Sequence, residues 1–559
     1  MAMVTPPLAD RVWLRHSSRA AGPGELLPWV DGRVVRHHLG GRRPGDARGG
    51  GGFRAGRDRT YAEFEDRAAR LATVLTDAGV GPGDKVACYL HNCAAYLETV
   101  FAAFKIGAVP VNVNYRYTRD ELTDLLTDAD AAALVFAREL AANVAHAVTH
   151  VPTLRVAIEA GGEELDRLLA TRPPRPAETR PGDDQLFMYT GGTTGRPKGV
   201  IWRQSDLMHA VVVPIYGPLG VPGLPATLDE AVAVAVTNAG RAPVTLPVVP
   251  LMHGTGLFNS MGALLVGGRV ITTRPGRLDP RHVWETVARQ RVSTLIVAGN
   301  AVCRPLVDEL AVRTHDLSSL RSVISSGTAL SDHLKHALHR RAEVTIFDAI
   351  ASSEGGPFAF AVTSSVDDLP SRFRPVPATR VFADGDREAA PGEVGVLGYS
   401  GPMPLGYHKD TAKTAATFRV IDGVRYSVPG DLVEVESDGA IRFLGRGSGV
   451  INTGGEKVHP QEVEDVLLAH PDVTDAVVVG VPDETWGERV AAVVAVSNPA
   501  VTGLREHVRR HLAGYKVPRT VVLLTELART PTGKVEIAWA RRVASSAGDQ
   551  QGDHRERGG

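Results

Sequence analysis

Apolar runs of strand length alternate with helical stretches early in this chain, and this alternation limits the fold more than any other feature. The strand-like runs are Val86–Leu90, Val109–Val113, Ala132–Phe136 and Val156–Ile158. Helical stretches, Ala94–Ile106 and Arg119–Thr127, fall between them. A strand–helix alternation of this kind predicts a layered α/β structure, because each element must bury one apolar face against the other kind.

The pattern repeats, and then changes, further along the chain. A second layered region is predicted from the strand-like runs Val244–Val249, Val270–Thr273, Thr294–Val297, Ser322–Ser325 and Val344–Phe347, with helices such as Pro280–Gln290. Between Gly392 and Phe443 short strands alternate with Gly and Asp-Gly turns, which is typical of a small antiparallel sheet. From Val450 onward, mixed helices and strands predict a separate α+β domain of about 100 residues, a common domain size.

These patterns divide the 559 residues. We expect a large α/β N-terminal domain over 1–447, built of two layered α/β subdomains plus a small antiparallel sheet region. A smaller α+β C-terminal domain follows over 448–544. Residues 39–58 are rich in Gly and Arg and predict a flexible insertion, and 545–559 predict a disordered tail.

A glycine- and threonine-rich segment, Tyr189–Gly199, predicts a phosphate-binding loop. Its central residues are Thr190, Gly191, Gly192, Thr193, Thr194, Gly195, Arg196, Pro197 and Lys198. Glycines let backbone N–H groups approach an anion, threonine hydroxyls add donors, and Arg196 and Lys198 supply positive charge. Apolar residues on both sides indicate that the loop links two strands. A P-loop NTPase is disfavoured, because Pro197 interrupts the required GxxxxGK[ST] spacing.

Four further clusters carry candidate chemistry, each with an ordinary structural alternative. His253 follows a strand-like run among glycines, where a lone histidine is more often structural than catalytic. Ser353 and Glu354 place a hydroxyl beside a carboxylate, which suits Mg²⁺ and a phosphate oxygen or, alternatively, a helix-capping turn. Asp431 and Arg446 suit ribose hydroxyls or an edge-of-sheet ion pair.

The fourth cluster, Arg529–Lys534, presents a lysine behind a Pro-Thr-Gly turn near the end of the last domain. Lys534 in such a turn is a mobile point charge, although most lysines in turns are simply solvated. The motif gains meaning only in combination with the other clusters.

Composition excludes several classes of protein. The formal net charge of −1 argues against nucleic acid as a partner. The three cysteines have no paired spacing, which predicts a reducing compartment and hence a cytoplasmic protein without a zinc site or disulfide framework. No apolar run is long enough to predict a transmembrane segment, and the N-terminus does not resemble a signal peptide.

In order and spacing, the motifs resemble the AMP-forming adenylating superfamily of acyl-CoA synthetases, adenylation domains and luciferases. The resemblance runs from about Thr60 to Trp539. The wording of its motifs is most similar to that of actinobacterial fatty-acid and steroid side-chain acyl-CoA synthetases. The motifs that carry it are TGGTTGRPKG, PGD, LGRG, INTGGEKVHPQEVE, GYKVPR and PTGK.

The resemblance implies ATP-dependent adenylation of a carboxylic acid, followed by transfer to coenzyme A. By this similarity Thr190–Lys198 contacts the β- and γ-phosphates, Ser353 the AMP phosphate, and Glu354 the Mg²⁺. Asp431 and Arg446 hold the ribose, and the backbone of Gly327 and Thr328 lines the adenine pocket. His253 is a candidate catalytic residue beside the acyl pocket.

The resemblance also implies that the C-terminal domain is mobile. Lys534 then bridges the carboxylate and the α-phosphate during adenylation. Rotation about a hinge near Gly447–Gly449 brings the face around Gly455 and Lys457 to the site for thioester formation. The family carries Asp or Lys where Ser448 stands, so hinge behaviour is open here.

A second departure concerns the adenine pocket. The family's Tyr-Gly-x-Thr-Glu motif is replaced by Ile350-Ala351-Ser352-Ser353-Glu354, which removes the aromatic ring that usually stacks on adenine. The hydroxyl and the carboxylate remain, so we expect nucleotide binding with altered adenine packing.

Three functions stay open from sequence. The leading one is an acyl-CoA or aryl-CoA ligase, in fatty acid metabolism or natural-product biosynthesis, that uses ATP, Mg²⁺ and coenzyme A on a small-molecule acid. An alternative is adenylation of nitrite for diazotisation of an aromatic amine. A third is a non-catalytic nucleotide-binding relative, which the retention of Lys198, Glu354, Asp431, Arg446 and Lys534 disfavours. The acid, the thiol or amine acceptor and the oligomeric state, with a homodimer as one option, are not encoded in the motifs.

Overall fold

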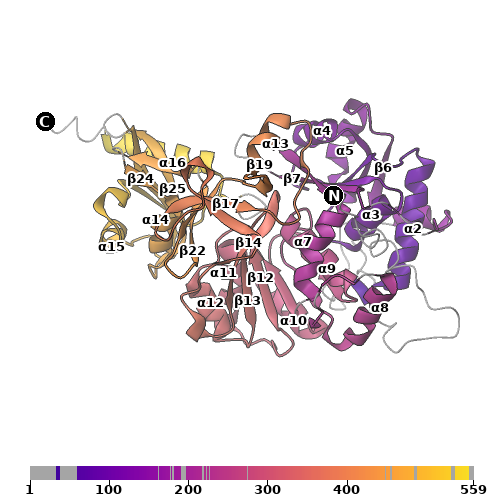
Figure 1. Ribbon diagram of the computed structural model, residues 1–559, viewed down its shortest axis with the longest axis horizontal. Coiled ribbons are helices and arrows are strands. Elements are labelled where there is room, and N and C mark those ends of the chain that lie inside the picture. The colour runs from indigo at the N-terminus through magenta and orange to yellow at the C-terminus, as the bar shows by residue number, and fades with distance from the viewer. Residues whose placement is uncertain are drawn as a thin grey trace, which may run out of the picture.

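The computed structural model of the chain has a large N-terminal part and a smaller C-terminal part beside it (Figure 1). It describes residues 33–37 and 59–552, apart from 161–162, 177, 179, 181, 191–196, 217–218, 222, 226, 274, 447–448, 454–455, 484–486 and 530–534. The predicted insertion 39–58 lies outside the described residues.

The first layered region is a seven-stranded sheet with the order β18-β8-β7-β4-β3-β5-β6. Its strands are β3 (Lys85–Tyr89), β4 (Val109–Asn112), β5 (Ala131–Ala137), β6 (Val156–Ala160), β7 (Gln185–Thr190), β8 (Lys198–Arg203) and β18 (Gly406–Tyr407). The pairs from β7 to β6 are parallel, whereas β8 and β18 add antiparallel strands at one edge. The helices of this region are α2 (Tyr61–Asp77), α3 (Ala94–Lys105), α4 (Arg119–Asp128), α5 (Ala141–His150) and α6 (Glu163–Ala170).

The second layered region is a nine-stranded sheet with the order β15-β14-β13-β12-β11-β9-β10-β1-β2. Its central strands are β9 (Val244–Pro247), β10 (Arg269–Thr272), β11 (Thr294–Val297), β12 (Ser322–Ser326) and β13 (Thr345–Ser352). The remaining strands are β14 (Gly355–Thr363), β15 (Arg374–Pro375), β1 (Arg33–His37) and β2 (Arg59–Thr60). Its helices are α9 (Gly254–Leu265), α10 (Pro280–Gln290), α11 (Gly299–Val312) and α12 (Asp332–His339), and α7 (Gln204–Tyr216) and α8 (Leu228–Thr237) lie between the two sheets in sequence.

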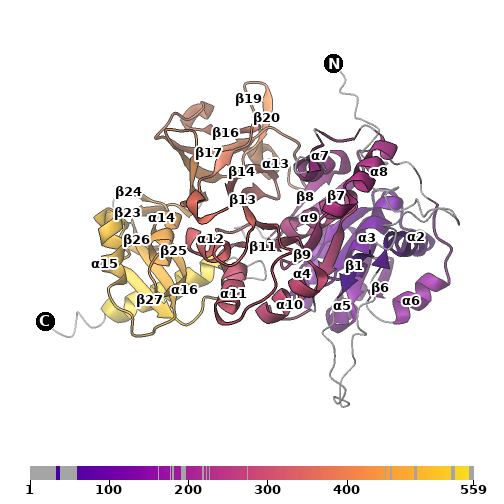
Figure 2. The same cartoon turned by 90° about the horizontal axis from the view of Figure 1, so that it is seen from below.

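The predicted small antiparallel sheet is confirmed. It contains β16 (Thr379–Phe382), β17 (Val394–Tyr399), β19 (Phe418–Ile421), β20 (Val424–Ser427), β21 (Asp431–Val435) and β22 (Ile441–Arg446). Its strands β16, β17, β19 and β20 stand above the second sheet and the C-terminal part in the view of Figure 2. A short helix, α13 (Thr411–Thr417), precedes β19.

The C-terminal part has its own sheet and its own core. Strands β23 (Ile451–Thr453), β24 (Glu456–Val458), β25 (Val473–Asp483), β26 (Gly487–Val496) and β27 (Thr520–Leu524) form the sheet. Helices α14 (Pro460–Leu468) and α15 (Leu504–His511) contribute to a core centred on Val478 and Val494, and α16 (Ile537–Gly552) packs against the opposite face.

Helix starts follow from capping chemistry that can be read in the sequence. Thr60 Oγ1 accepts a hydrogen bond from the Glu63 backbone N–H at the start of α2, and the Glu63 carboxylate accepts one from the Thr60 backbone N–H. Thr118 and Glu121 form the same capping box at the start of α4. At the C-terminal end, the prediction of a disordered tail from Ser545 is wrong as far as Gly552, because α16 continues through these residues. Residues 553–559 lie outside the described residues.

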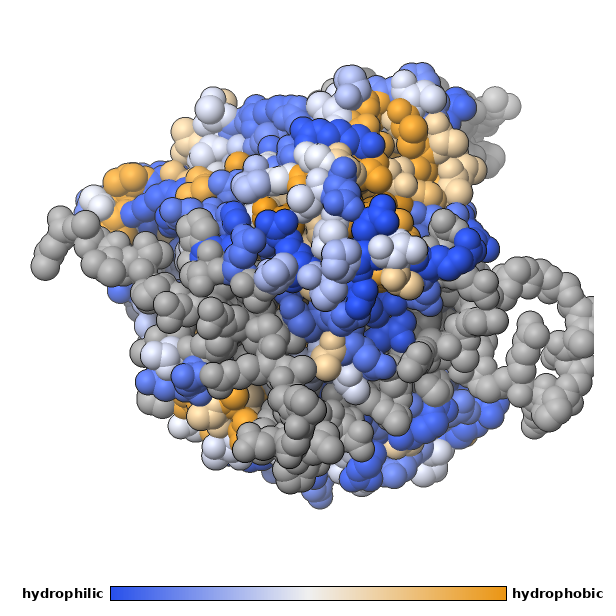
Figure 3. Space-filling model, turned by 90° about the vertical axis from the view of Figure 1, so that its right-hand side faces the viewer, coloured by the Kyte–Doolittle hydropathy of each residue, from blue (hydrophilic) through white to orange (hydrophobic). Residues whose placement is uncertain are grey.

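The described surface is mixed in polarity. On the face drawn in Figure 3, the coloured atoms are largely hydrophilic, with separate hydrophobic areas between them. Among the described residues, the helices are all too short or too polar to cross a lipid bilayer.

Candidate active site

Each of the two large sheets ends in an antiparallel hairpin, and the candidate site lies where these hairpins meet. In the first sheet, β7 and β8 pair from Gln185↔Arg203 to Thr190↔Lys198. The predicted phosphate loop therefore joins two strands, as expected, and Thr190 and Lys198 stand opposite each other at its base. Gly191, Gly192, Thr193, Thr194 and Gly195 lie outside the described residues.

In the second sheet, β13 and β14 turn tightly through Ser353 and Glu354. The predicted alternative, a helix-capping turn, is wrong because the segment is a strand-to-strand turn. Glu354 is only 8% exposed, so its carboxylate needs hydrogen-bond donors. The Tyr407 hydroxyl donates to Glu354 Oε1 at 2.8 Å. Ser427 Oγ donates to the Glu354 carbonyl at 2.6 Å.

The lysine at the base of the phosphate loop also has a partner. Lys198 Nζ donates to Asp410 Oδ2, and both side chains are about a quarter exposed. Asp410 is the N-cap of α13 and accepts the backbone N–H of Lys413 at 2.8 Å. The Lys198 ammonium, followed by this backbone donor, lowers the pKa of the Asp410 carboxyl below its usual range.

His253 is held at the start of α9 by contacts of its loop with the first sheet. Asn112 is buried at the end of β4 and donates from Nδ2 to the carbonyls of Met252 (2.6 Å) and Tyr189 (2.9 Å). A Cβ at Gly256 would lie 2.4 Å from the Pro250 carbonyl oxygen, so the loop can fold this tightly only with glycine. This packing places His253 on the wall of the cleft.

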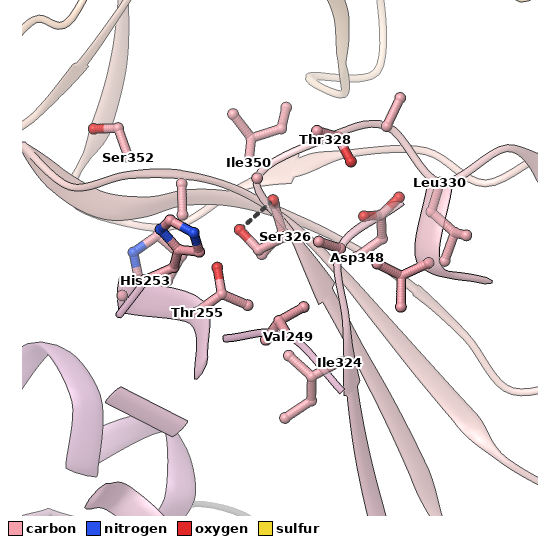
Figure 4. Close-up of a pocket in the computed structure, with 18 of the residues that line it drawn as sticks. Val249, His253, Thr255, Ile324, Ser326, Thr328, Leu330, Asp348, Ile350 and Ser352 are labelled. Carbon is pink, nitrogen blue, oxygen red and sulfur yellow. Dashed lines mark hydrogen bonds between the residues drawn. The ribbon is translucent and has the colours of Figure 1, made fainter. Parts of the chain in front are cut away.

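Gly327 and Thr328 follow β12 and line the same cleft. Ser326 Oγ donates to the Ala349 carbonyl at 3.2 Å, which ties the end of β12 to β13 (Figure 4). Gly299 has φ +54°, and a Cβ there would lie 2.2 Å from Thr328 Oγ1. The loop can therefore reach the start of α11 only because residue 299 is glycine. Ile350, which replaces the family's tyrosine, also lines this wall.

Asp431 begins β21 and is 5% exposed. It pairs in register with Arg446 at the end of β22. The structure thus brings the two residues together across adjacent strands, as both sequence interpretations require. The Arg446 side chain lies outside the described residues.

One cleft of about 3240 Å³ is lined by Thr190, His253, Thr328, Glu354 and Asp431, and Lys198 pairs in register with the lining residue Thr190. From the described residues of the C-terminal part, the lining comes from α14, β25 and the segments on either side of 530–534. Arg529 there pairs with Asp475 at 2.6 Å. Lys534 and Gly455 lie outside the described residues, and Lys457 is described in backbone only, on β24.

On the C-terminal wall of the cleft, the surroundings of Glu464 disfavour its ionised form. Glu464 on α14 accepts the Val478 N–H at 2.8 Å. Burial raises its pKa to about 8, and the nearby carboxylates of Asp465 and Asp475 add to the increase, whereas the Val478 donor and Arg529 oppose it. With this pKa, Glu464 holds its proton at neutral pH.

Part of the cleft is lined by apolar side chains, and we call this part its apolar extension. Its lining comes from β8, α7, α9 and the segment after α7, namely Trp202, Leu207, Ala210, Ile215, Leu219 and Phe258. The rings of Trp202 and Phe258 pack edge to face, with their centroids 6.2 Å apart. Trp202 also donates from Nε1 to the Ser353 carbonyl at 3.0 Å, so the apolar wall is tied to the turn that carries Glu354.

Sequence reasoning missed the residues that hold the candidate groups in place. Tyr407 and Ser427 give no local motif, because their role depends on a contact between distant strands. Asp410 carries a partial signal, since aspartate before a helical stretch is a common N-cap. Asn112 carries none, because a single asparagine at a strand end has many uses.

Comparison with known proteins gives a consistent result. A family described as AMP-binding enzyme matches residues 46–408, and its C-terminal domain matches 462–534. A 3-oxocholest-4-en-26-oate–CoA ligase from Rhodococcus rhodochrous is 38% identical, covering 87% of this chain and 91% of that protein. A medium/long-chain-fatty-acid–CoA/3-oxocholest-4-en-26-oate–CoA ligase from Mycobacterium tuberculosis is 38% identical, covering 89% and 94%.

The solved structures agree in fold. An anthranilate CoA ligase in complex with anthranoyl-AMP superimposes with a TM-score of 0.77 at 23% identity, covering 96% of this chain and 97% of that one. The chain belongs to the AMP-binding enzyme family. Within this family it is an AMP-forming acyl-CoA ligase, which uses ATP and coenzyme A.

Proposed function

We propose that this ligase activates carboxylic acids with a long apolar body, of the fatty-acid or steroid side-chain type, and transfers them to coenzyme A. The observation that supports the proposal is the apolar extension lined by Trp202, Leu207, Ile215 and Phe258, which opens from the same cleft as Glu354 and Asp431. Burial of an apolar tail there contributes about 25 cal/mol per Å² of surface removed from water. The two relatives described above are named for acids of this class.

The nucleotide is proposed to lie along the two hairpins. Thr190, Lys198 and the glycine-rich loop between them bind the β- and γ-phosphates, because backbone N–H groups and an ammonium suit anions. Ser353 binds the α-phosphate, and the backbone of Gly327 and Thr328 borders the adenine. Asp431 and Arg446 hold the ribose, since a carboxylate accepts hydrogen bonds from both hydroxyls.

Glu354 fits the Mg²⁺ expected with ATP. Hard cations take oxygen ligands, and Mg²⁺ is usually held by one or two carboxylates together with substrate phosphates. Tyr407 donates to Oε1 of Glu354, which leaves Oε2 for a cation. The described residues contain no cluster of three or more His, Cys, Asp or Glu that could hold a metal ion.

Lys534 is proposed to stabilise the charge that builds between carboxylate and α-phosphate. Arg529 and Val535, on either side of its segment, line the cleft, which supports action of this segment in the adenylation step. Fixed positive charge is worth most where negative charge develops in the transition state. Gly455 and Lys457 are proposed to serve the thioester step after domain rotation. His253 borders the acid carboxylate.

A substrate panel tests the acid class. Pyrophosphate release is measured with saturated fatty acids of increasing chain length, a steroid side-chain acid, benzoic and cinnamic acids, and nitrite with an aminophenol-type acid, each with and without coenzyme A. We expect kcat/KM to rise with the length of the apolar chain, with thioester formed only when coenzyme A is present. Preference for the small aromatic acids contradicts the proposed class, and release that needs nitrite and ignores coenzyme A contradicts the ligase chemistry.

The Lys534→Ala variant tests the division of labour between the two steps. We expect loss of adenylate formation with thioester formation from preformed acyl-adenylate largely retained. Equal loss of both steps would contradict separate roles for the two faces of the C-terminal domain.

A further inference from the structure

One short segment, Gly406–Thr414, contacts both charged groups of the candidate ATP site. It begins as β18, which extends the first sheet beyond β8 through the pairs Gly406↔Ile201 and Tyr407↔Val200. The Leu405 N–H donates to the Ile201 carbonyl and the His408 N–H to the Gly199 carbonyl, both at 2.8 Å. The segment is therefore fixed to the strand that begins with Lys198.

From this strand, Tyr407 reaches the other hairpin. Its hydroxyl donates to Glu354 Oε1 at 2.8 Å, in a buried contact between residues 53 positions apart. One face of the ring is covered by Lys413, whose Nζ lies 4.5 Å from the ring centroid. The Tyr407 N–H donates to Thr414 Oγ1 at 2.9 Å. Neither the ring nor the hydroxyl of Tyr407 can move without disturbing these contacts.

Three residues after Tyr407, Asp410 reaches Lys198. The aspartate is fixed by its second oxygen, which caps α13 through the Lys413 N–H. A lysine ammonium has three N–H donors, so the pair with Asp410 leaves two of them for phosphate oxygens. The cap therefore sets the direction in which Lys198 presents its charge.

We propose that Gly406–Thr414 positions the two charges that bind Mg²⁺-ATP, Tyr407 by orienting the Glu354 carboxylate and Asp410 by orienting the Lys198 ammonium. The inference rests on the proposed function of Glu354 and Lys198. Both residues act as positioning residues, because each contacts a ligand-binding side chain and fixes its direction. Removing a residue that is hydrogen-bonded to a metal ligand typically lowers metal affinity or activity by about 10- to 100-fold.

The first test uses Tyr407→Phe, which keeps the ring, the strand pairing and the contact with Lys413 but removes the hydroxyl. Adenylation is measured as pyrophosphate release over a Mg²⁺ titration at saturating ATP and acid. We expect the Mg²⁺ concentration for half-maximal rate to rise about tenfold. Tyr96→Phe, at a fully buried tyrosine in the core of the first sheet region, is the matched control and is expected to match wild type.

A double-mutant cycle separates this inference from the proposed function. If Tyr407 acts through Glu354, adding Tyr407→Phe to Glu354→Gln produces no further change in Mg²⁺ dependence. If Glu354→Gln alone changes Mg²⁺ dependence while Tyr407→Phe behaves as wild type, the positioning role is overturned and the proposed function stands. If Glu354→Gln leaves Mg²⁺ dependence unchanged, the proposed metal role itself is overturned.

The second test uses Asp410→Asn, because asparagine is an equally good N-cap and preserves α13 while removing the charge. We expect the KM for ATP to rise about five- to tenfold with kcat changed less, since ground-state placement of Lys198 is lost. An unchanged KM for ATP overturns the role of Asp410. A lowered KM also overturns it, because it would mean that Asp410 competes with phosphate for Lys198.

Discussion

The two hairpins that end the large sheets reach the cleft in the same way but are stabilised differently. At the β7–β8 hairpin, Lys198 meets Asp410 in a pair that is about a quarter exposed. At the β13–β14 hairpin, Glu354 is nearly buried and its carboxylate and carbonyl accept hydrogen bonds from Tyr407 and Ser427. A partly exposed charge can exchange partners when a ligand arrives, whereas a buried carboxylate depends on fixed donors. We therefore expect changes at the second hairpin to be more costly.

The largest effect is expected for Glu354→Gln. The amide keeps the size of the side chain but removes the charge that faces the proposed cation, so kcat/KM for adenylation falls about 100- to 1000-fold. Pyrophosphate release at saturating acid measures it. Glu393→Gln, at an exposed glutamate paired with Arg387, is the control and retains activity. A loss below tenfold would place the essential carboxylate elsewhere.

Lys198→Ala is expected to have the next largest effect. It removes one of several phosphate contacts in a partly exposed position, so kcat/KM for ATP falls about 10- to 100-fold, less than for Glu354. The matched control is Arg281→Ala, which removes the cation of an exposed ion pair with Glu285 at 2.8 Å on α10. A larger loss for Lys198 than for Glu354 would reverse the order of the two hairpins.

The sequence predicts one of the two hairpins better than the other. The glycine-rich loop after Tyr189 carries its signal in consecutive residues, and its placement between two strands follows from the apolar runs on either side. The Ser353–Glu354 turn carries too little local information to exclude a helix cap. Its chemistry depends on contacts with Tyr407 and Ser427. These contacts could not be predicted, because both residues are distant from the turn in sequence. The helical continuation of Ser545–Gly552 was missed because polar residues alone do not reveal packing of the preceding turns of α16 on the sheet.

Glu464 offers a third setting, on the C-terminal wall of the cleft, where a carboxyl group faces other carboxylates. Its pKa of about 8 lies above the usual 4.5, so the folded state binds a proton that the unfolded state has released between these pH values. The free energy of unfolding therefore falls as pH rises from about 5 to 8. Glu464→Gln is expected to remove this pH-dependent fall in the free energy of unfolding.

The expected gain of Glu464→Gln over wild type is near zero at pH 5 and about 2 kcal/mol at pH 8, reduced from the full shift because the side chain is only partly buried. Denaturant midpoints across this pH range measure it. Glu506→Gln, at an exposed glutamate on α15, is expected to show a difference that does not change with pH. A pH-independent effect at Glu464 would mean that this carboxyl group is charged in the folded state.

The smallest effect is expected for Ser427→Ala, which removes the donor to the Glu354 carbonyl while leaving the Tyr407 contact with the carboxylate. Loss of one buried hydrogen bond lowers the free energy of unfolding by about 1 kcal/mol. Ser400→Ala, in the same sheet region, removes a longer contact of 3.1 Å to the Ala378 carbonyl and is the control for losing a serine hydroxyl there. If Ser427→Ala reduces adenylation as strongly as Tyr407→Phe, the turn is fixed through its backbone rather than through the carboxylate. Because Ser427 donates to the main-chain carbonyl of Glu354 and Tyr407 donates to its side chain, the two variants separate the main-chain and side-chain contributions to the rigidity of this hairpin.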